Sequence, residues 1–328
     1  MKDLKVVSLF SGAGGLDLGF KQAGYNIALA IDYCEKAIKT HSVNQLSDKA
    51  IIADIKDIGA LGVAKLIAQE IPHGSKIGII GGPPCQGFSH ANTNSHTDDP
   101  RNQLATIYME IVGILCASHD VSFVLMENVK GLTSEKHILT FQELKQNLIG
   151  NGFKTYSSEL NSVNFGVPQT RKRVFLIGLN NSHEGNFEFP EPNTKIKTVR
   201  DVIGELPEPA YYRREITVSD IPHHPNHWTM RPKSKRFKTK DFNNRLSRCF
   251  RKVEWDKPSQ TIAFGNREIF VHPRGHRRLS IFEAMLLQGF PKYFQLIGNL
   301  SSQVTQISNA VPPPVAKAIA KRIKLSIV

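Results

Sequence analysis

The sequence predicts an α/β protein: a mixed, mostly parallel sheet with helices on both faces, joined to a small, irregular domain that contains some strands. Two observations support this fold class. Over residues 1–184, short apolar runs of strand length alternate with amphipathic helical segments, as in parallel sheets with crossover helices. Over residues 185–275 this periodicity weakens, and Pro, Asn, His and basic residues accumulate. We expect residues 276–304 to connect the two domains and a helix within residues 305–328 to pack on the first sheet.

The composition is that of a globular protein with an unusual charge balance. The 328 residues are 40% hydrophobic, and 42 Lys and Arg against 29 Asp and Glu give a net charge of +13. Such an excess favours a polyanionic partner, most simply nucleic acid, over a small neutral substrate. No run of 18 apolar residues is present, so we expect neither a membrane span nor a signal peptide. The four cysteines form no Cys-x-x-Cys pair, which favours a reducing compartment and argues against a zinc site.

The first strand and the loop after it predict a nucleotide-binding unit. Val6–Phe10 is apolar, the loop Ser11-Gly12-Ala13-Gly14-Gly15 follows, and a helical pattern begins there. Glycines let backbone amides and a helix N-terminus approach a ligand closely. The second strand, Asn26–Ile31, ends in Asp32, which is placed to bind ribose hydroxyls. Because the loop matches neither the dinucleotide fingerprint nor a phosphate-binding P-loop, we expect a nucleoside cofactor without a phosphate chain.

Two further strands end in polar features on the same expected edge. Ala50–Ala53 leads to Asp54, which is either a cofactor ligand or the cap of the next helix. Ile77–Ile80 leads to Gly81-Gly82-Pro83-Pro84-Cys85-Gln86-Gly87-Phe88-Ser89. Prolines fix the backbone and glycines permit close approach, so this loop holds one thiol still. Cys85 is therefore a candidate nucleophile, although a buried cysteine often serves only as a small core residue.

The second half of the sheet adds one acid and two arginines. A helix pattern runs from Pro100 to about Cys116, and the fifth strand, Val121–Met126, delivers Glu127. A carboxyl at the end of a buried strand is costly, so we interpret Glu127 as a catalytic acid rather than a structural ion-pair partner. Arg171 and Arg173 precede the apolar run that ends at Leu179, and as strand residues they would face one way. They would then bind an anion or a base carbonyl, the alternative being a surface row of ion pairs.

The irregular region concentrates the positive charge. Between Arg231 and Lys252, ten Lys or Arg residues stand against one acid, a net of +9, with aromatic residues interleaved. A basic run is often only a solvated surface, but this combination favours a nucleic-acid groove. The candidate contacts are Arg231, Lys233, Lys235 and Arg236. Further on, Ser280-x-x-Glu283 is a capping box that opens a helix.

These features together fit covalent group transfer to a nucleobase. Addition of a thiolate to C6 of a pyrimidine turns the ring into an enamine whose C5 can attack a methyl group. An acid at N3 assists this addition if burial keeps the carboxyl protonated. The reacting base must also leave the duplex stack, which costs a few kcal/mol.

The chain resembles the bacterial DNA (cytosine-5)-methyltransferases, whose fold is Rossmann-like, from one end to the other. The segments that carry the resemblance are, in chain order, Phe10-Ser11-Gly12-Ala13-Gly14-Gly15, Pro83-Pro84-Cys85-Gln86, Glu127-Asn128-Val129, Gln169-x-Arg171-x-Arg173, Arg278-Leu279 with Gln288-Gly289-Phe290-Pro291, and Asn309-Ala310-Val311. One departure lies at Ser308, where the family usually has Gly before the Asn.

The resemblance implies a role for each matching residue. Cys85 would be the nucleophile, Glu127 would contact N3 and the amino group of cytosine, Arg173 would contact the base and Arg171 would support the thiol region. S-adenosylmethionine, which leaves as S-adenosylhomocysteine, would be bound by Phe10, Ala13, Gly15, Asp32, Tyr33, Asp54, Ile55, Pro84, Leu104, Asn309, Ala310 and Val311. Residues 185–275 would be the target recognition domain, and DNA would also meet Gln86, Ser89 and Thr261.

We expect a cytoplasmic monomer that needs no metal and methylates double-stranded DNA on the nucleoid. It would act either with a cognate restriction endonuclease as a genetic partner or as an orphan methylase. Three alternatives stay open: a tRNA cytosine-5 methyltransferase of the same fold, a catalytically inactive DNA-binding relative, and a nicotinamide oxidoreductase. The DNA sequence that is methylated cannot be read from the chain.

Overall fold

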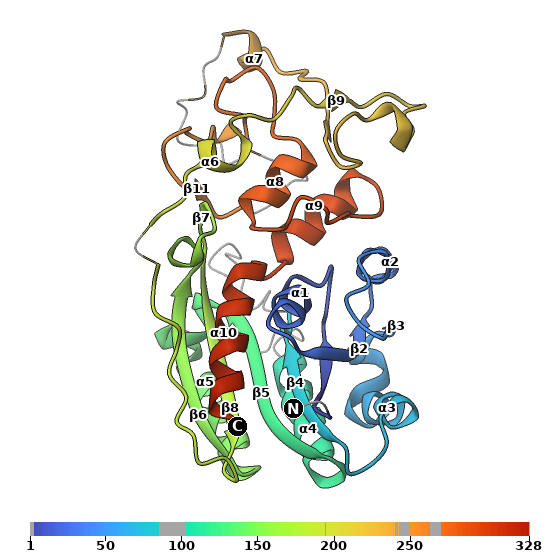
Figure 1. Cartoon of the computed structure of the whole chain (residues 1–328), viewed down its shortest axis with the longest axis vertical. Coiled ribbons are helices and arrows are strands. Elements are labelled where there is room, and N and C mark those ends of the chain that lie inside the picture. The colour runs from blue at the N-terminus through green and yellow to red at the C-terminus, as the bar shows by residue number, and fades with distance from the viewer. Residues whose placement is uncertain are drawn as a thin grey trace. The chain divides into compact units, whose positions relative to one another are not determined.

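The computed structural model of the chain divides into two compact units, which are described separately (Figure 1). It describes residues 3–84, 103–193, 195–239, 242, 250–262 and 270–327. Unit 1 comprises Met1–Asn161, Lys172–Glu191 and Val315–Val328, and unit 2 comprises Ser162–Arg171 and Pro192–Pro314.

Unit 1 is built on a seven-stranded sheet in the order β3-β2-β1-β4-β5-β8-β6. The neighbours from β3 to β5 are parallel, whereas β8 runs antiparallel to both β5 and β6. The bounds are β1 (Lys5–Leu9), β2 (Asn26–Asp32), β3 (Lys49–Ile52), β4 (Lys76–Gly81), β5 (Asp120–Val129), β6 (Phe153–Asn161) and β8 (Lys172–Asn180). This mixed, mostly parallel, Rossmann-like sheet confirms the predicted fold class.

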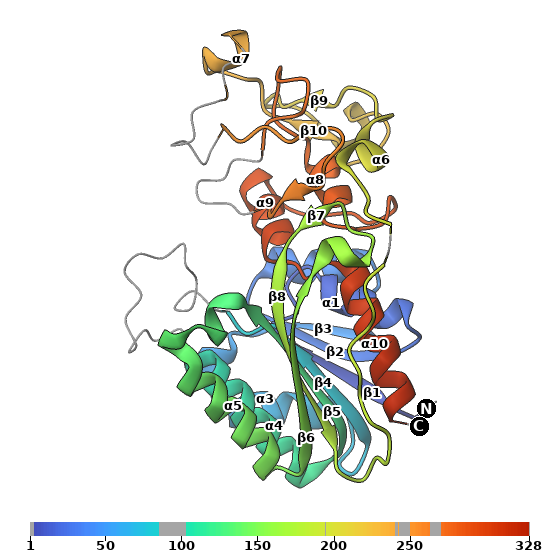
Figure 2. The same cartoon turned by 90° about the vertical axis from the view of Figure 1, so that its left-hand side faces the viewer.

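Helices cover both faces of the sheet. Figure 2 shows α3, α4 and α5 on one face and α1 and α10 on the other. The helices are α1 (Gly15–Gln22), α2 (Glu35–Val43), α3 (Ile55–Glu70), α4 (Gln103–Ser118), α5 (Ile138–Gly150) and α10 (Pro313–Ser326), with the short 3-10 turns η1 (Lys130–Thr133) and η2 (Glu135–His137) before α5. Among the described residues, no helix has the length and apolar character needed to cross a membrane.

The apolar runs of the strands form the core. On one face, Ile111, Val112 and Leu115 of α4 are fully buried within the largest hydrophobic cluster, each contributing about 1.5–3 kcal/mol. On the other face the ring of Phe123 lies so close to Gly78 that a Cβ on this glycine would sit 2.3 Å from it. Strand β4 can therefore carry only glycine at that position.

The border between the units lies at residue 191, seven residues beyond the expected position. Residues 185–191 stay with unit 1 because Arg322 of α10 pairs with Glu188 at 2.7 Å and Ser326 Oγ donates to the Asn186 carbonyl. Residues 276–314, in part expected as a connecting segment, are integral to unit 2. There Asn226 Nδ2 donates to the carbonyl of Leu296 at 2.9 Å.

Unit 2 consists of short elements, as the weak periodicity predicts. Its two sheets are parallel pairs of two-residue strands, β9 with β10 and β7 with β11. The bounds are η3 (Ser162–Phe165), β7 (Gln169–Thr170), α6 (Val199–Ile203), β9 (Ala210–Tyr211), η4 (Val218–Asp220), β10 (Trp228–Thr229), α7 (Arg236–Thr239), β11 (Ser259–Gln260), α8 (Ile281–Leu287) and α9 (Leu300–Asn309). The predicted capping box opens α8: Ser280 Oγ accepts from the Glu283 amide, and the Glu283 carboxylate accepts from the Ser280 amide at 2.7 Å.

Candidate active site

The candidate site lies at the carboxyl edge of the parallel strands in unit 1. Strands β2, β1, β4 and β5 are hydrogen-bonded neighbours that run in one direction, so the residues that follow them meet at one edge. After β1 the chain forms β2 and β3 on one side of β1, and it then returns to place β4 on the other side. This reversal of strand order is where open α/β sheets bind ligands.

The glycine loop after β1 is tied to the end of β2 by one carboxylate. Asp32 accepts from the amide of Gly12 at 2.8 Å through Oδ2 and from the amide of Cys34 at 2.8 Å through Oδ1. Its side chain is buried, and this burial raises the pKa of Asp32, while the two amide hydrogen bonds and nearby His41 oppose the shift. Asp32 therefore holds the shape of the loop in addition to ending the strand.

The glycines of this loop have different surroundings. Gly12 (φ 54°) has open space where a Cβ would be, since no other heavy atom lies within 4 Å. Gly14 (φ 83°) has no such open space, because a Cβ there would sit 2.1 Å from Leu46 and 2.8 Å from His41. Phe10 also adopts a positive φ of 53°, which is costly for a residue with a side chain. The loop thus packs inward at Gly14 and leaves free volume beside Gly12.

The other predicted cofactor residues of unit 1 surround this loop. Tyr33 is 66% exposed directly after β2, while Ile55 is buried at the start of α3. Asp54 caps α3, its Oδ1 accepting from the Lys56 amide at 2.9 Å, so the cap interpretation of this residue is confirmed. Ala13 and Gly15 are buried, whereas Pro84 and Leu104 are partly exposed.

The base of the predicted cysteine loop rests against Glu127. A Cβ on Gly82 would lie 3.2 Å from Glu127 Oε2, a tight contact that would push the carboxyl away by a few tenths of an ångström. Next along the loop, the carbonyl of Pro83 accepts from Asn128 Nδ2 at 3.4 Å. Cys85, Gln86 and Ser89 lie outside the described residues.

Glu127 and Arg173 form an ion pair on adjacent strands. Arg173 lies opposite Val129 in the antiparallel pairing of β5 with β8, and its Nε is 3.1 Å from Glu127 Oε1. The Glu127 side chain is 10% exposed and that of Arg173 is 18% exposed. A largely buried carboxyl, a guanidinium and the start of a cysteine loop are thus brought together at one edge.

Arg171 has a different environment, and the expectation that it shares a strand face with Arg173 is wrong. Strand β7 ends at Thr170 and β8 begins at Lys172, so Arg171 lies between two strands. The Arg171 carbonyl accepts from both the amide and the hydroxyl of Ser162, each at 2.9 Å, directly beyond the last residue pair of β6 with β8, Asn161 with Lys172. The Arg171 side chain is buried, and its Nη1 donates to the carbonyl of Ser308 at 2.8 Å.

The predicted cofactor turn of unit 2 follows α9. Asn309 is exposed, whereas Ala310 and Val311 are buried. The hydroxyl of Ser308, the residue that departs from the family pattern, donates to the Thr305 carbonyl at 3.0 Å within α9. Sequence reasoning assigned no role to Gln288, yet its Nε2 donates to the Ala310 carbonyl at 2.6 Å. Nothing in the local sequence signals this contact, because the partners are 22 residues apart.

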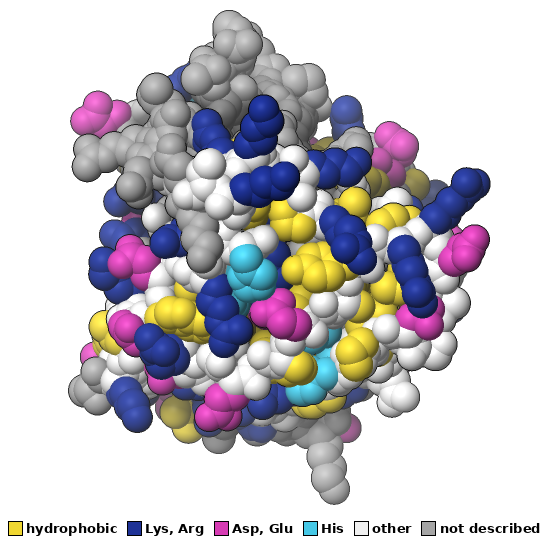
Figure 3. Space-filling model, turned by 90° about the horizontal axis from the view of Figure 1, so that it is seen from above, with side chains coloured by type: hydrophobic (Ala, Val, Ile, Leu, Met, Phe, Trp, Pro, Cys, Tyr) yellow, Lys and Arg dark blue, Asp and Glu magenta, His cyan; other side chains and the backbone are white. Residues whose placement is uncertain are grey.

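Arginine–aromatic stacking organises part of the basic segment. The guanidinium of Arg236 lies 4.9 Å from the centre of the Phe250 ring, that of Arg278 also lies 4.9 Å from it, and that of Arg231 lies 5.3 Å from the Tyr211 ring. Lys233 and Lys235 are exposed. Figure 3 shows Lys and Arg side chains spread across the face seen from above.

Thr261, predicted to meet DNA, makes an internal contact. Its hydroxyl donates to the carbonyl of Thr170 at 2.7 Å, and the amide of the next residue, Ile262, donates to Gln169 Oε1 at 3.2 Å. This pair of hydrogen bonds joins β7 to the chain after β11, so Thr261 has a structural function in unit 2.

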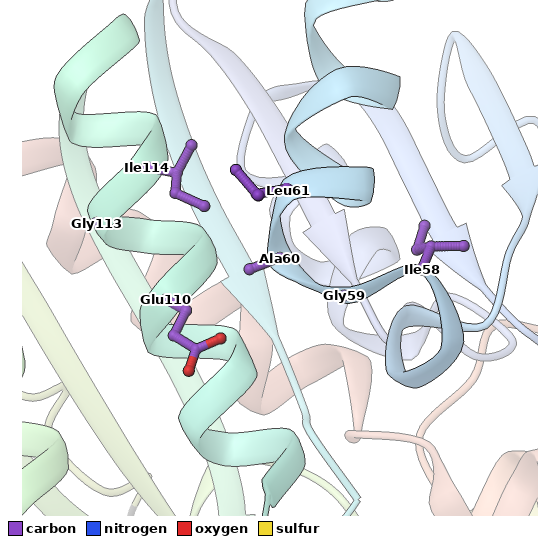
Figure 4. Close-up of a pocket in the computed structure, with 7 residues that line it drawn as sticks. All are labelled: Ile58, Gly59, Ala60, Leu61, Glu110, Gly113 and Ile114. Carbon is purple, nitrogen blue, oxygen red and sulfur yellow. The ribbon is translucent and has the colours of Figure 1, made fainter.

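A hollow on the helical layer lies apart from these residues (Figure 4). It is lined by Ile58, Gly59, Ala60 and Leu61 of α3 and by Glu110, Gly113 and Ile114 of α4. Its wall is apolar except for Glu110, and none of the predicted catalytic or cofactor residues lines it. Within the described part of the chain, no group of three or more His, Cys, Asp and Glu side chains is arranged to hold a metal ion.

Comparison with known proteins decides which family has this arrangement. The model of the C-5 cytosine-specific DNA methylases matches residues 4–325. The chain belongs to this family.

Individual relatives support the same assignment. The type II methyltransferase M.MthTI of Methanothermobacter thermautotrophicus is 36% identical, covering 98% of this chain and 97% of the relative. M.FnuDI of Fusobacterium nucleatum is 32% identical, covering 98% of this chain and 94% of the relative. Among solved structures, a protein described as a DNA modification methyltransferase encoded within an Escherichia coli prophage superposes with a TM-score of 0.80 at 25% identity, covering 98% of this chain and 99% of its own. This chain is therefore a DNA cytosine-5-methyltransferase of the type II kind, and the nicotinamide oxidoreductase alternative is excluded.

Proposed function

We propose that this methylase transfers a methyl group from S-adenosylmethionine to C5 of a cytosine within a specific duplex DNA sequence, using a covalent bond between Cys85 and C6 of an extruded base. The observation that carries the proposal is the placement of Glu127, which lies beside Gly82 at the base of the Cys85 loop and 3.1 Å from Arg173. In this proposal unit 1 carries Glu127, Arg173 and most of the cofactor residues, and unit 2 holds the Asn309–Val311 cofactor turn and the target recognition region.

The residues at the carboxyl edge fit the cofactor. Free volume beside Gly12 gives a nucleoside access to the loop backbone, and the exposed ring of Tyr33 can stack on a base. Asp32 and Asp54 offer carboxylates for ribose hydroxyls, although each already accepts from backbone amides. When bound, S-adenosylmethionine supplies an electrophilic methyl group.

The chain's own residues would prepare cytosine to take that methyl group. The Cys85 thiolate adds to C6, and a proton from Glu127 at N3 neutralises the charge that develops on the ring. Arg173 holds the Glu127 carboxyl in place and offers its remaining N–H groups to the base. After C5 has taken the methyl group, the C5 proton passes to solvent, the C6–S bond breaks to release the Cys85 thiolate, and the N3 proton returns to Glu127, which restores the aromatic ring.

The basic, irregular region of unit 2 favours duplex DNA over tRNA as the substrate, and so do the type II methyltransferases among the relatives. Their names also support a role in restriction-modification, with a cognate endonuclease as a genetic partner or with the enzyme acting alone. Bisulfite sequencing of DNA from cells that express the chain identifies the methylated cytosine. Transfer of label to tRNA but not to DNA would overturn the choice of substrate.

Replacement of the proposed nucleophile tests the covalent step directly. We expect Cys85→Ala to abolish transfer of the labelled methyl group from S-adenosylmethionine to DNA while DNA binding is retained. Cys116→Ala, on α4 and partly buried, is the matched control and should keep full activity. Substantial methyl transfer by Cys85→Ala would contradict the covalent mechanism but leave the family assignment unchanged.

A further inference from the structure

Two side chains from distant parts of unit 2 bind backbone carbonyls of the Ser308–Ala310 segment. Arg171 Nη1 donates to the Ser308 carbonyl at 2.8 Å, and Gln288 Nε2 donates to the Ala310 carbonyl at 2.6 Å. Helix α9 ends at Asn309, so both carbonyls belong to the end of a helix, where intrahelical donors run out. A guanidinium there also interacts favourably with the negative end of the helix dipole.

A second carboxamide fixes the orientation of Gln288. Gln169 Nε2 donates to Gln288 Oε1 at 2.7 Å, and Gln169 Oε1 accepts from the amide of Ile262 at 3.2 Å. Both glutamines are fully buried. Because each carboxamide accepts at one end and donates at the other, Gln288 can only present its NH₂ group to Ala310.

The burial of Arg171 argues that it has a purpose in this position. It is only 2% exposed, and a buried guanidinium costs several kcal/mol unless hydrogen bonds compensate it. It lies between β7 and β8 rather than on a face shared with Arg173, and Arg173 is the arginine that pairs with Glu127. The two arginines of the Gln-x-Arg-x-Arg motif thus serve different parts of the molecule.

We propose that Arg171, together with Gln288, is a positioning residue for the cofactor turn at Asn309–Val311 and thereby sets the affinity for S-adenosylmethionine, rather than acting on the cytosine or the thiol. This inference rests on the proposed role of that turn in cofactor binding. The two hydrogen bonds fix the direction in which the chain leaves α9, and therefore the position of the exposed Asn309.

The test measures cofactor binding apart from catalysis. S-adenosylhomocysteine is titrated calorimetrically into the full-length protein without DNA, and kcat and KM are measured for both substrates. Arg171→Met and Gln288→Met should each raise the Kd for S-adenosylhomocysteine and the KM for S-adenosylmethionine about tenfold, as expected when one buried hydrogen bond is removed. At saturating cofactor, kcat and the KM for DNA should change little. Arg171→Lys keeps a donor and should restore most of the affinity.

Gln306→Met is the matched control. Gln306 is a buried glutamine of α9, the helix that leads into the turn, but its Nε2 donates to the Ile297 carbonyl, away from the turn. Its Kd for S-adenosylhomocysteine should equal that of the wild type.

An unchanged Kd in Arg171→Met, with a large drop in kcat, would overturn the proposal and assign Arg171 to the base. If thermal melting shows that Arg171→Met does not fold, Gln288→Met decides by the same criterion. Failure of the proposed function has a different signature, since the wild-type protein itself would then neither bind S-adenosylhomocysteine nor methylate DNA.

Discussion

At the scale of single residues, the proposed chemistry depends on the Glu127 carboxyl, which lies between Gly82 and Arg173. Gly82 leaves room for Glu127 Oε2, and Arg173 Nε lies 3.1 Å from the other oxygen. The arginine limits the rotation of the carboxyl, and the missing Cβ allows it to approach the loop that leads to Cys85. Both contacts fix the position of the Glu127 carboxyl at the edge of the sheet.

Glu127→Gln tests this assignment. An amide of the same shape keeps a hydrogen bond but transfers no proton, so we expect kcat to fall about 100-fold or more. Affinity for DNA and for S-adenosylhomocysteine should stay within a small factor of the wild type. Glu159→Gln, which breaks the surface pairs of Glu159 with Lys130 and Lys172 at 3.1 and 3.2 Å, provides the control and should leave kcat unaltered. An undiminished rate in Glu127→Gln would remove the acid role.

Residue patterns predicted some contacts of the site and missed others. Asp32 and Glu127 each come directly after an apolar run, Asp32 as the last residue of β2 and Glu127 near the end of β5, so local sequence was enough to locate them at the sheet edge. The partner of Arg171 could not be predicted, because 137 residues separate it from Ser308. Alternation alone also suggested one strand through Arg171 and Arg173. Arg171 instead falls between β7 and β8, and its carbonyl binds Ser162, which is nine residues away in the sequence.

At the scale of elements, burial determined which strands were predictable. Strands β1, β2, β4, β5 and β8 are almost continuously apolar and were all anticipated near their observed bounds. Strand β6 was missed, because as an edge strand it mixes polar and apolar residues and is half exposed along most of its length. Helix α9 was missed as well. Its apolar residues Leu300, Val304 and Ile307 do recur at helical spacing, but the stripe is short and Ser, Thr and Gln fill most of the other positions.

The histidines of unit 2 give this unit an acid sensitivity. Burial lowers the pKa of His224 to about 4, and burial together with nearby Arg277 lowers the pKa of His272 to about 4. The folded state therefore holds both rings neutral, while the unfolded chain takes up protons near pH 6.5. The stability that this provides is complete above about pH 6.5 and declines as the pH falls toward 4.

We expect unit 2 to lose a few kcal/mol of unfolding free energy between about pH 6.5 and pH 4.5. The chain has two tryptophans, Trp228 and Trp255, and both lie in unit 2, so their fluorescence reports on this unit. Denaturant unfolding at several pH values measures the slope of the unfolding free energy against pH. His272→Gln should flatten it, whereas His73→Gln in unit 1 should not. A slope that is the same in wild type and His272→Gln would contradict the assignment.

At the scale of the whole molecule, the net charge of +13 is concentrated where the resemblance places DNA recognition. Stacking on Tyr211 and Phe250 holds Arg231 and Arg236 in defined positions, while Lys233 and Lys235 extend from the surface without such stacking among the described residues. Stacked arginines are suited to reading base edges, and exposed lysines are suited to neutralising phosphates.

Charge removal should therefore change the salt dependence of DNA binding. Replacing Lys233, Lys235 and Arg236 by Gln should reduce the slope of log K against log salt by about 0.9 for each phosphate that the variant no longer neutralises. Lys36→Gln with Lys65→Gln, two exposed lysines on α2 and α3, is the control and should leave the slope unchanged. An unaltered slope in the triple variant would indicate that DNA binds to another surface of the protein.

The connectivity of unit 1 has a consequence for how the protein is made. Strand β8 lies between β5 and β6 in the sheet, and α10 covers the same unit, with Tyr25 Oη donating to the Ala320 carbonyl. A ribosome that has released only residues 1–161 has exposed β5 and β6 without the strand that joins them. The first unit can close only after the second has been synthesised in full. The sheet is complete once β8 (Lys172–Asn180) has been synthesised, but the face that α10 covers stays open until residues 313–326 follow, so most of unit 2 is made while that face is exposed.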